Sequence, residues 1–226
     1  MNRITVHMGH YGSGKTELSL NLALQLIKEE KKVILVDLDI VNPYFRSGEH
    51  KEMLEKLGAS VIRPNFEGTN VDVPSLPADI VRAFIEKDAY VIFDVGGDSS
   101  GATALGRYHQ DISEDDNIVK CIVNTARPFT STSDDIVDMV GQLEASSRLK
   151  IDVLVNNTNV AYDTTAEMLV SGQRIVEDAA KALKIPVSEI GAMPEIIEKL
   201  PKEFVEKYES IIVPINLYMR KDWMDL

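Results

Sequence analysis

Short apolar runs alternate along this chain with longer segments in which apolar residues recur every three or four positions. The short runs predict β-strands, because they are rich in Val and Ile and are bounded by polar or glycine residues. Several, such as VILV in the second run, are apolar at consecutive positions, which is typical of strands covered on both faces. The predicted strands are Ile4–Met8, Val33–Leu38, Ser60–Arg63, Tyr90–Asp94, Val119–Asn124, Val153–Asn156 and Ile211–Pro214.

The longer segments predict amphipathic helices. In the first of them, Leu18, Leu22 and Leu26 lie on one helical face. The predicted helices are Lys15–Glu30, Ser47–Leu57, Pro77–Glu86, Ser133–Ala145 and Thr165–Leu183. Strand–helix alternation predicts an α/β fold with a mostly parallel sheet and helices on both faces, a three-layer α/β/α arrangement. A chain of 226 residues can bury one large core, so we expect a single domain over residues 1–226.

A phosphate-binding loop (P-loop) follows the first predicted strand. In a parallel sheet the loops after the strands lie along one edge, where ligands bind. GHYGSGKT, from Gly9 to Thr16, has the spacing Gly-x4-Gly-Lys-Thr and leads directly into a helix. In such a loop the backbone N–H groups converge on phosphate, the lysine reaches the β- and γ-phosphates, and the threonine hydroxyl holds Mg²⁺. We assign nucleotide binding to Gly9, Gly12, Ser13, Gly14, Lys15, Thr16 and Glu17. The alternative is a glycine-rich turn with an incidental lysine.

Carboxylates follow the second and fourth predicted strands. Asp37 and Asp39 lie at i and i+2 in DLDIVNP, so they share one face of an extended segment. Asp39 comes just beyond the strand, where it would approach the γ-phosphate or its attacking water; the alternative is that it caps the following turn. Asp94 ends the strand in FDVGG, where a magnesium-linked Walker-B carboxylate lies. Asp98 is either a second carboxylate of the site or a turn residue.

The loops after later strands add further candidates. Gly97, with the glycine before it, would let the backbone approach the γ-phosphate. Arg127, held in an extended loop by the proline that follows, contacts phosphate or a partner, or faces solvent. Asn156 or Asn157, at the end of the sixth strand, would pair with both the donor and the acceptor of an adenine edge, unless it is a turn residue.

These motifs, in this order, resemble those of the MinD/ParA/CobQ-like P-loop ATPases of the SIMIBI class. The resemblance covers most of the chain, from Ile4 to Ile215, and rests on the P-loop, DLD, DVGG and VNN. It implies a P-loop NTPase fold with ATP and Mg²⁺ as cofactors. The roles that it implies are phosphate and Mg²⁺ binding by Lys15 and Thr16, water activation by Asp39, Mg²⁺ binding through water by Asp94, γ-phosphate sensing by Gly97 and adenine reading by Asn156. We therefore expect Lys15, Asp39 and Asp94 to be catalytic, and Thr16, Asp39 and Asp94 to surround the metal.

The chain departs from this family within the loop itself. The deviant Walker A pattern, K-G-G-x-G-K-T, has a signature lysine where this chain has His10, and a glycine where it has Tyr11. In the family that lysine reaches the nucleotide of the other subunit in a dimer. A homodimer is therefore an open alternative here. Protonated His10, Arg46 or Arg127 would supply the missing charge, or His10 is a loop residue that does not contact phosphate.

Net charge, apolar content and cysteine count limit the kinds of partner and location that we expect. The formal net charge of −12 disfavours binding to nucleic acid or to anionic membranes. We see no secretion signal at the start of the sequence and no apolar stretch of about 20 residues that would span a membrane. The single cysteine, Cys121, lies in the apolar run VKCIVN and is expected in the core rather than in a metal site. We expect a cytoplasmic protein.

The leading functional hypothesis is a slow ATPase that acts as a nucleotide-dependent switch or maturation chaperone for an unidentified client enzyme. ATP is favoured over GTP because NNTN lacks the Lys and Asp of a guanine-binding Asn-Lys-x-Asp motif. Two alternatives remain open. One is an ATP-dependent ligase or small-molecule kinase resembling dethiobiotin synthetase, and the other is a nucleotide sensor with little catalysis.

Overall fold

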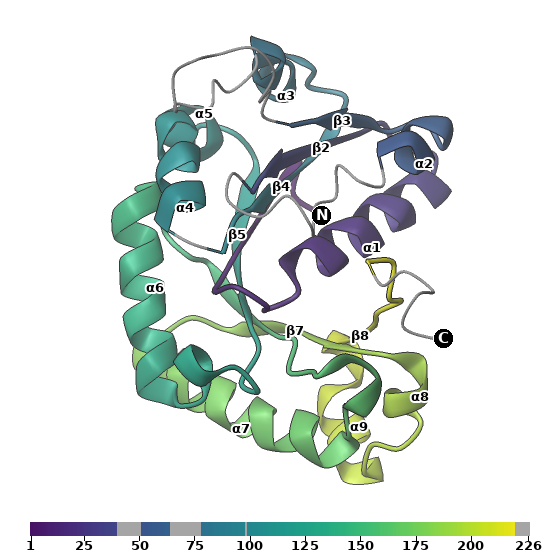
Figure 1. Ribbon diagram of the computed structural model, residues 1–226, viewed down its shortest axis with the longest axis vertical. Helices are drawn as coiled ribbons and strands as arrows, with labels where there is room; N and C mark the ends of the chain where they lie inside the picture. Colours follow the sequence, from purple (N-terminus) through teal and green to yellow (C-terminus); the bar gives the residue numbers. More distant parts are fainter. Residues whose placement is uncertain (40–50, 64–77, 98, 220–226) are drawn as a thin grey trace.

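Eight parallel strands form one sheet (Figure 1). The computed structural model describes residues 1–39, 51–63, 78–97 and 99–219. The strands are β1 (Ile4–Met8), β2 (Val33–Leu38), β3 (Ser60–Ile62), β4 (Tyr90–Val95), β5 (Asn117–Val123), β6 (Val153–Asn156), β7 (Val187–Ala192) and β8 (Ile212–Pro214). Their order across the sheet is β3-β2-β4-β1-β5-β6-β7-β8, and every neighbouring pair is parallel.

Helices cover both faces of the sheet. They are α1 (Lys15–Lys28), α2 (Lys51–Lys56), α3 (Arg82–Ile85), α4 (Ser99–Leu105), α5 (His109–Ser113), α6 (Ser133–Ser147), α7 (Ala166–Leu183), α8 (Pro194–Ile197) and α9 (Lys202–Tyr208). Figure 1 shows α4, α6 and α7 along one side of the sheet and α1 with α2 along the other. The longer helices α6 and α7 each begin at a threonine whose hydroxyl accepts a hydrogen bond from a first-turn N–H.

The consecutive apolar residues of the strands are explained by these two layers. Along β2, Ile34 and Val36 pack into the core with α4, α6 and α7, whereas Val33 and Leu35 pack with α1 and α2. A strand that is buried on both faces needs apolar side chains at odd and even positions alike. The α/β fold with a parallel sheet between two helical layers is therefore confirmed.

The chain reverses its direction across the sheet at β1. This strand lies between β4 and β5; β2 and β3 lie beyond β4, and β6, β7 and β8 lie beyond β5. At such a reversal the loops that leave the strands diverge, so a crevice opens at their carboxyl ends. The P-loop follows β1 and therefore lies at this crevice.

Several elements differ from the sequence-based expectation. β7 was missed because VSEIGA is interrupted by Ser188 and Glu189, and its first half is only partly buried. α4 was missed because SSGATAL is short and built from small residues. The helix expected over Pro77–Glu86 is a 3₁₀ turn (Ala78–Val81) followed by α3. Of the helix expected over Ser47–Leu57, residues 47–50 lie outside the described part, and α2 accounts for most of the rest.

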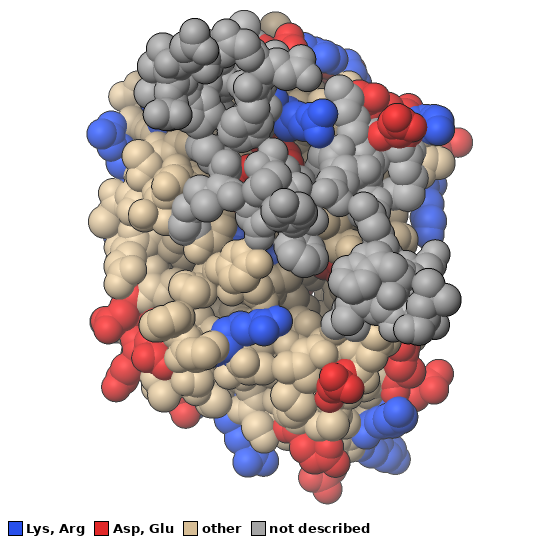
Figure 2. Space-filling model, in the orientation of Figure 1, with Lys and Arg blue, Asp and Glu red and all other residues tan. Residues whose placement is uncertain are grey.

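Two expectations from composition can be compared with the structure. Cys121 is fully buried in β5, paired in register with Met8, and burial raises the pKa of its thiol to about 12. On the face shown in Figure 2, acidic and basic side chains of the described residues are interspersed. Within the ranges that the structure describes, no helix combines the length and apolar character needed to cross a bilayer.

An ion pair fastens the amino-terminal edge of the sheet, opposite the P-loop. Arg3 precedes β1 and donates from Nε to Asp115 Oδ1 at 2.8 Å, and a second guanidinium nitrogen contacts Oδ2. Arg3 Nη1 also donates to the carbonyl oxygen of Ala83 at 3.0 Å. Side chains of both charged residues are largely buried, so this pair ties the starts of β1 and β5 to α3.

Asp115→Asn is expected to destabilise the protein more at neutral pH than at acidic pH. The hydrogen bonds from Arg3 hold the pKa of Asp115 well below its usual range. The ionised carboxylate therefore stabilises the folded state above its unfolded pKa, which is about 4, and this contribution is lost as the pH falls toward the folded pKa. We expect the free energy of unfolding to fall by about 1–3 kcal/mol at pH 7 and by less at pH 3, measured by urea denaturation.

The matched control is Asp138→Asn on the exposed side of α6, which should change little at either pH. Equal losses at both pH values for Asp115→Asn would contradict a role for its charge.

Candidate functional site

The P-loop wraps around the start of α1. Gly14 is the N-cap of α1 and has φ 88°, in the left-handed region. Lys15 is the first helical residue, its side chain is largely buried, and its Nζ donates to the carbonyl oxygen of His10 at 3.0 Å. The N–H groups of the first helical turn have no partner within the helix and attract anions. Lysine and helix end therefore present positive charge to the same space.

Two buried carboxylates lie on neighbouring strands beside this loop. Asp37 of β2 and Asp94 of β4 are paired in register, and each is at most 1% exposed. Burial, and after it the charge of Asp37, raises the pKa of Asp94 to about 7. The backbone N–H of Asp39 donates to Asp37 Oδ1 at 2.9 Å. Asp37 therefore fixes the position at which Asp39, two residues further on, leaves the sheet.

This arrangement fits a divalent cation. Among the described residues neither carboxylate oxygen of Asp94 has a hydrogen-bond partner of ordinary geometry, although both are buried. The Thr16 hydroxyl is close enough to lower the pKa of Asp94. A buried carboxylate in this state is costly unless a cation balances it. No cluster of three or more His, Cys, Asp or Glu side chains in the described ranges could hold a metal alone. That suits Mg²⁺, which is usually held by one or two carboxylates together with water and phosphate oxygens.

The loop after β4 packs directly on the P-loop. A Cβ atom added to Gly97 would lie 2.6 Å from the backbone of Tyr11, which leaves no room for a side chain. A Cβ atom added to Gly96 would lie 3.2 Å from Asp39 Cα. These two glycines bring the loops after β1, β2 and β4 into contact, so a displacement of one loop is transmitted to the others.

An asparagine network holds the P-loop from the opposite side. Asn157 Nδ2 donates to the carbonyl oxygen of Ser13 at 2.8 Å. Asn124 Nδ2 donates to the carbonyl oxygens of Gly12 at 3.2 Å and of Asn159 at 2.8 Å. The ends of β5 and β6 are therefore hydrogen-bonded to the P-loop and to each other. Buried amide networks of this kind, when satisfied, fix one arrangement of the backbone.

Asn156 points away from this network. It is fully buried, and its Nδ2 donates to Gln173 Oε1 at 3.0 Å. Its Oδ1 accepts hydrogen bonds from the N–H and the hydroxyl of Thr158, at 3.0 and 2.7 Å. The hydrogen-bonding groups of Asn156 are thus engaged inside the protein. The prediction that Asn156 reads adenine is therefore corrected, because this side chain does not line the cavity. Asn157, its neighbour, is the asparagine that lines the cavity.

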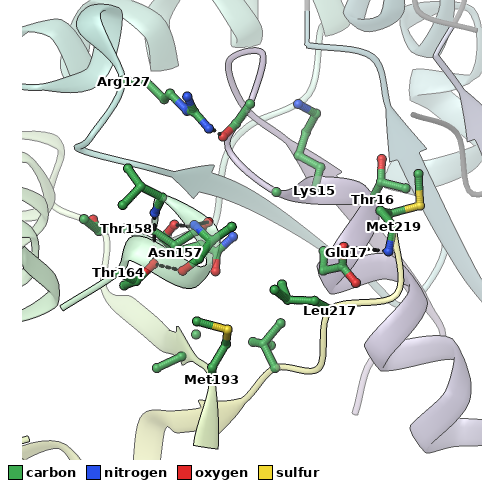
Figure 3. A pocket seen from close by; sticks show the side chains of 18 of the residues that line it. Lys15, Thr16, Glu17, Arg127, Asn157, Thr158, Thr164, Met193, Leu217 and Met219 are labelled. Carbon is green, nitrogen blue, oxygen red and sulfur yellow. Dashed lines mark hydrogen bonds between the residues drawn. The ribbon is translucent and has the colours of Figure 1, made fainter. Parts of the chain in front are cut away.

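A cavity of about 560 Å³ extends from the P-loop to the C-terminal end of the described chain (Figure 3). Figure 3 shows Lys15 and Arg127 at one end and Met193 and Leu217 at the other. The polar end is lined by Gly12, Gly14, Lys15, Thr16, Asp39, Gly97 and Arg127, and the apolar end by Leu169, Ala192, Met193, Ile215 and Leu217. A ligand that is anionic at one end and flat and apolar at the other fits this shape.

The cavity brings together most of the residues assigned from the sequence. Those that line it are Gly12, Gly14, Lys15, Thr16, Glu17, Asp39 and Gly97. Four assigned residues do not line the cavity. Gly9 and Ser13 belong to the P-loop, and Asp94 and Asn156 are buried at the ends of β4 and β6. The Glu17 carboxylate accepts hydrogen bonds from the backbone N–H groups of Tyr218 and Met219. Asp98 and Arg46 lie outside the described residues.

Comparison with known families decides the classification. The profile of the CobQ/CobB/MinD/ParA nucleotide binding domain (CbiA) matches residues 4–221, which is nearly the whole chain. The chain belongs to the CobQ/CobB/MinD/ParA nucleotide-binding family. The resemblance inferred from its motifs is therefore confirmed. No curated protein matches the sequence.

Solved structures confirm the fold of this CobQ/CobB/MinD/ParA protein. The cell division protein FtsY of Thermotoga maritima has a TM-score of 0.58 at 19% identity, over 84% of this chain and 61% of that one. Chloroplast FtsY of Physcomitrella patens has a TM-score of 0.56 at 19% identity, with coverage of 89% and 62%. Signal recognition particle 54 kDa protein of Aeropyrum pernix K1, in complex with GDP, has a TM-score of 0.53 at 22% identity, with coverage of 83% and 40%. The chain thus spans less than two thirds of each neighbour, and at these identities the likeness establishes the SIMIBI-class P-loop fold alone.

The loop that contains His10 and Tyr11 meets the loop after β5 at an aromatic contact. The ring of His10 packs at 5.2 Å, centroid to centroid, on Phe129 from the loop after β5. Phe129 is 68% exposed and Tyr11 is 57% exposed. Aromatic side chains from the loops after β1 and β5 are therefore exposed beside the cavity.

Sequence reasoning did not assign several residues that shape the site. Asp37 and Asn124 carried a usable signal, since each is a polar residue at the end of an otherwise apolar strand. Asn159 lies in a polar run in which several asparagines were equally plausible. Residues 215–219 carried no signal, because their place beside α1 depends on contacts about 200 positions apart in the sequence.

Gly14→Ala and Gly141→Ala should change stability in opposite directions. At Gly14 the new Cβ would lie 2.2 Å from Asn157 Nδ2 and φ is 88°, so we expect a loss of about 1–3 kcal/mol. Gly141 lies within α6, and nothing would lie within 4 Å of its new Cβ, so we expect a gain of about 0.4–1 kcal/mol. Thermal or urea denaturation measures both, and an unchanged stability for Gly14→Ala would contradict the P-loop conformation.

Proposed function

We propose that this protein binds Mg²⁺-ATP in the cavity and hydrolyses it slowly, as a nucleotide-dependent switch or maturation chaperone for a client enzyme. The observation that carries the proposal is the cavity itself. It joins the P-loop lysine and threonine to a carboxylate and a glycine loop at one end and to an apolar wall at the other. A triphosphate would occupy the polar end of the cavity, and a nucleotide base would occupy the apolar end.

At the phosphate end, different residues would contact the phosphates and the magnesium ion. Lys15 now bonds to the carbonyl oxygen of His10, and a bound phosphate would offer it a stronger, charge-assisted partner. Thr16 and Asp94 are the groups that would hold Mg²⁺, with Asp37 next to them. When bound, Mg²⁺ supplies positive charge that offsets the charge developing on the transferred phosphoryl group.

Asp39 is the group placed to orient or activate the attacking water. It lines the cavity and is only partly buried, unlike Asp37 and Asp94. Its backbone is held by Asp37 Oδ1, and its Cα lies against the loop after β4. A carboxylate in such a position accepts a hydrogen bond from water in line with the γ-phosphate.

The base end favours adenine. Guanine presents N–H donors that proteins commonly satisfy with a carboxylate. Among the described lining residues the only carboxylates are Asp39, at the phosphate end, and Glu17, which already accepts two backbone hydrogen bonds. Asn157 lines this cavity; its Nδ2 already donates to the carbonyl oxygen of Ser13, so the backbone around it would supply the remaining donors and acceptors that adenine requires.

The same contacts explain how the nucleotide would act as a switch. A γ-phosphate at the P-loop would press on Gly97 and Tyr11, whose backbones leave no room for a side chain between them. Exposed Tyr11 and Phe129 flank this point. A client enzyme, or a second copy of this chain, that covers these aromatic side chains would therefore read the state of the nucleotide.

Lys15→Ala should weaken Mg²⁺-ATP binding by at least about 100-fold, because a charge-assisted contact to the phosphates is lost. Isothermal titration calorimetry measures the change. Lys31→Ala, beyond the other end of α1 and exposed, is the matched control and should bind as the parent does. Equal affinities for the parent and Lys15→Ala would contradict the phosphate assignment.

Asp39→Asn should slow ATP hydrolysis by about 10²-fold or more while ATP binding stays within a few-fold of the parent. Phosphate release under single-turnover conditions measures the rate. Three results would redirect the proposal. Hydrolysis unchanged in Asp39→Asn removes the role of Asp39, turnover that requires a small metabolite identifies a ligase or kinase, and binding without hydrolysis in the parent identifies a sensor.

A further inference from the structure

The segment 215–219 is a thin wall between two cavities. Ile215, Leu217 and Met219 line the nucleotide cavity. Asn216 and Tyr218 line a second cavity of about 460 Å³ that lies against α1; Ile215 lines both cavities, and from Asn216 on successive residues alternate between them. Alternation of this kind is the property of an extended segment, whose successive side chains point to opposite sides. The apolar end of the nucleotide cavity therefore depends on where this segment lies.

Hydrogen bonds hold the wall in addition to apolar packing, in which Leu217 lies on the cluster of α7, α8 and α9 and Tyr218 and Met219 lie on that of α1 and α2. Its first residue is held by the sheet, since Ile215 N–H donates to the carbonyl oxygen of Ala192 at 2.8 Å. Asn216 makes two hydrogen bonds with Asn21 of α1. Asn21 Nδ2 donates to the carbonyl oxygen of Asn216, and the backbone N–H of Asn216 donates to Asn21 Oδ1, both at 2.9 Å. Beyond that point Glu17 supplies the side-chain hydrogen bonds to the described chain.

Glu17 accepts two hydrogen bonds from consecutive backbone groups of the wall. The N–H groups of Tyr218 and Met219 both point to its carboxylate, the second at 3.2 Å. A glutamate in the first turn of a helix usually serves the N-cap, but the N-cap here is Gly14 and makes no side-chain cap. The carboxylate of Glu17 thus accepts hydrogen bonds from the wall and does not cap its own helix (Figure 3).

The sequence position of Glu17 links the two ends of the site. It directly follows Thr16, so the turn of α1 that faces phosphate also holds the wall of the base end. We propose that Glu17 and Asn21 are positioning residues for the nucleoside: they hold Leu217 and Met219 against the base, and neither contacts the phosphates. This inference rests on the proposed function, since it names what sets the base end of the same site.

The test separates base from phosphate by comparing two ligands. Calorimetry would measure Mg²⁺-ATP and Mg²⁺-tripolyphosphate binding to the parent, Glu17→Ala, Glu17→Gln and Asn21→Ala. We expect Glu17→Ala to weaken ATP by about 10-fold or more and tripolyphosphate by less than about two-fold, because only the nucleoside touches the wall. Glu17→Gln keeps an acceptor oxygen and should recover part of the ATP affinity. Gln25→Ala, one turn beyond Asn21 on exposed α1 surface, is the control.

Hydrogen exchange of residues 212–219 gives an independent readout. ATP should slow exchange there in the parent but not in Glu17→Ala, and circular dichroism checks that the variant is folded. Equal losses for both ligands would place Glu17 at the phosphates and overturn the proposal. Unchanged ATP affinity together with unchanged exchange would also overturn it. If the parent bound no ATP, the proposed function itself would fail, whereas Lys15-dependent binding that ignores Glu17 would refute only this inference.

Discussion

Two carboxylates buried side by side impose the constraint on which the rest of the site depends. Asp37 and Asp94 are neighbours because β2 and β4 are paired in register, so the backbone leaves them no freedom to separate. In a medium of low polarity, two negative charges this close cannot both persist without positive charge nearby. Lys15 and the end of α1 are the sources that the fold brings to this point, and the proposed Mg²⁺ would add to them. Burial and, after it, the charge of Asp37 raise the pKa of Asp94.

The two sides of the P-loop are held by different kinds of contact. Toward β2 and β4, glycines let the backbones of the loops lie in close contact, with no room for a side chain between them. Toward β5 and β6, amide side chains bridge the loops through directional hydrogen bonds. The P-loop is therefore fixed by close backbone contact on one side and by amide hydrogen bonds on the other.

The sequence predicted the parts of the site that depend on local order along the chain. Strand, loop, glycine, lysine and threonine follow one another in GHYGSGKT, and the parallel fold then places DLD and DVGG beside them. It failed where the outcome depends on which way a side chain turns or on distant contacts. Asn156 and Asn157 are adjacent and chemically identical, and both are buried, but the first turns toward α7 and Gln173 while the second lines the cavity. Nothing local in residues 215–219 indicates that they meet α1.

The single cysteine has a practical meaning. Cys121 lies in the middle of the sheet beside the strand that precedes the P-loop, with no exposed surface and a thiol that is almost wholly protonated at neutral pH. A thiol reagent therefore reaches it only when β5 separates from its neighbours. The rate at which Cys121 is modified therefore measures how often the central strands separate. This measurement requires neither a label nor a substitution.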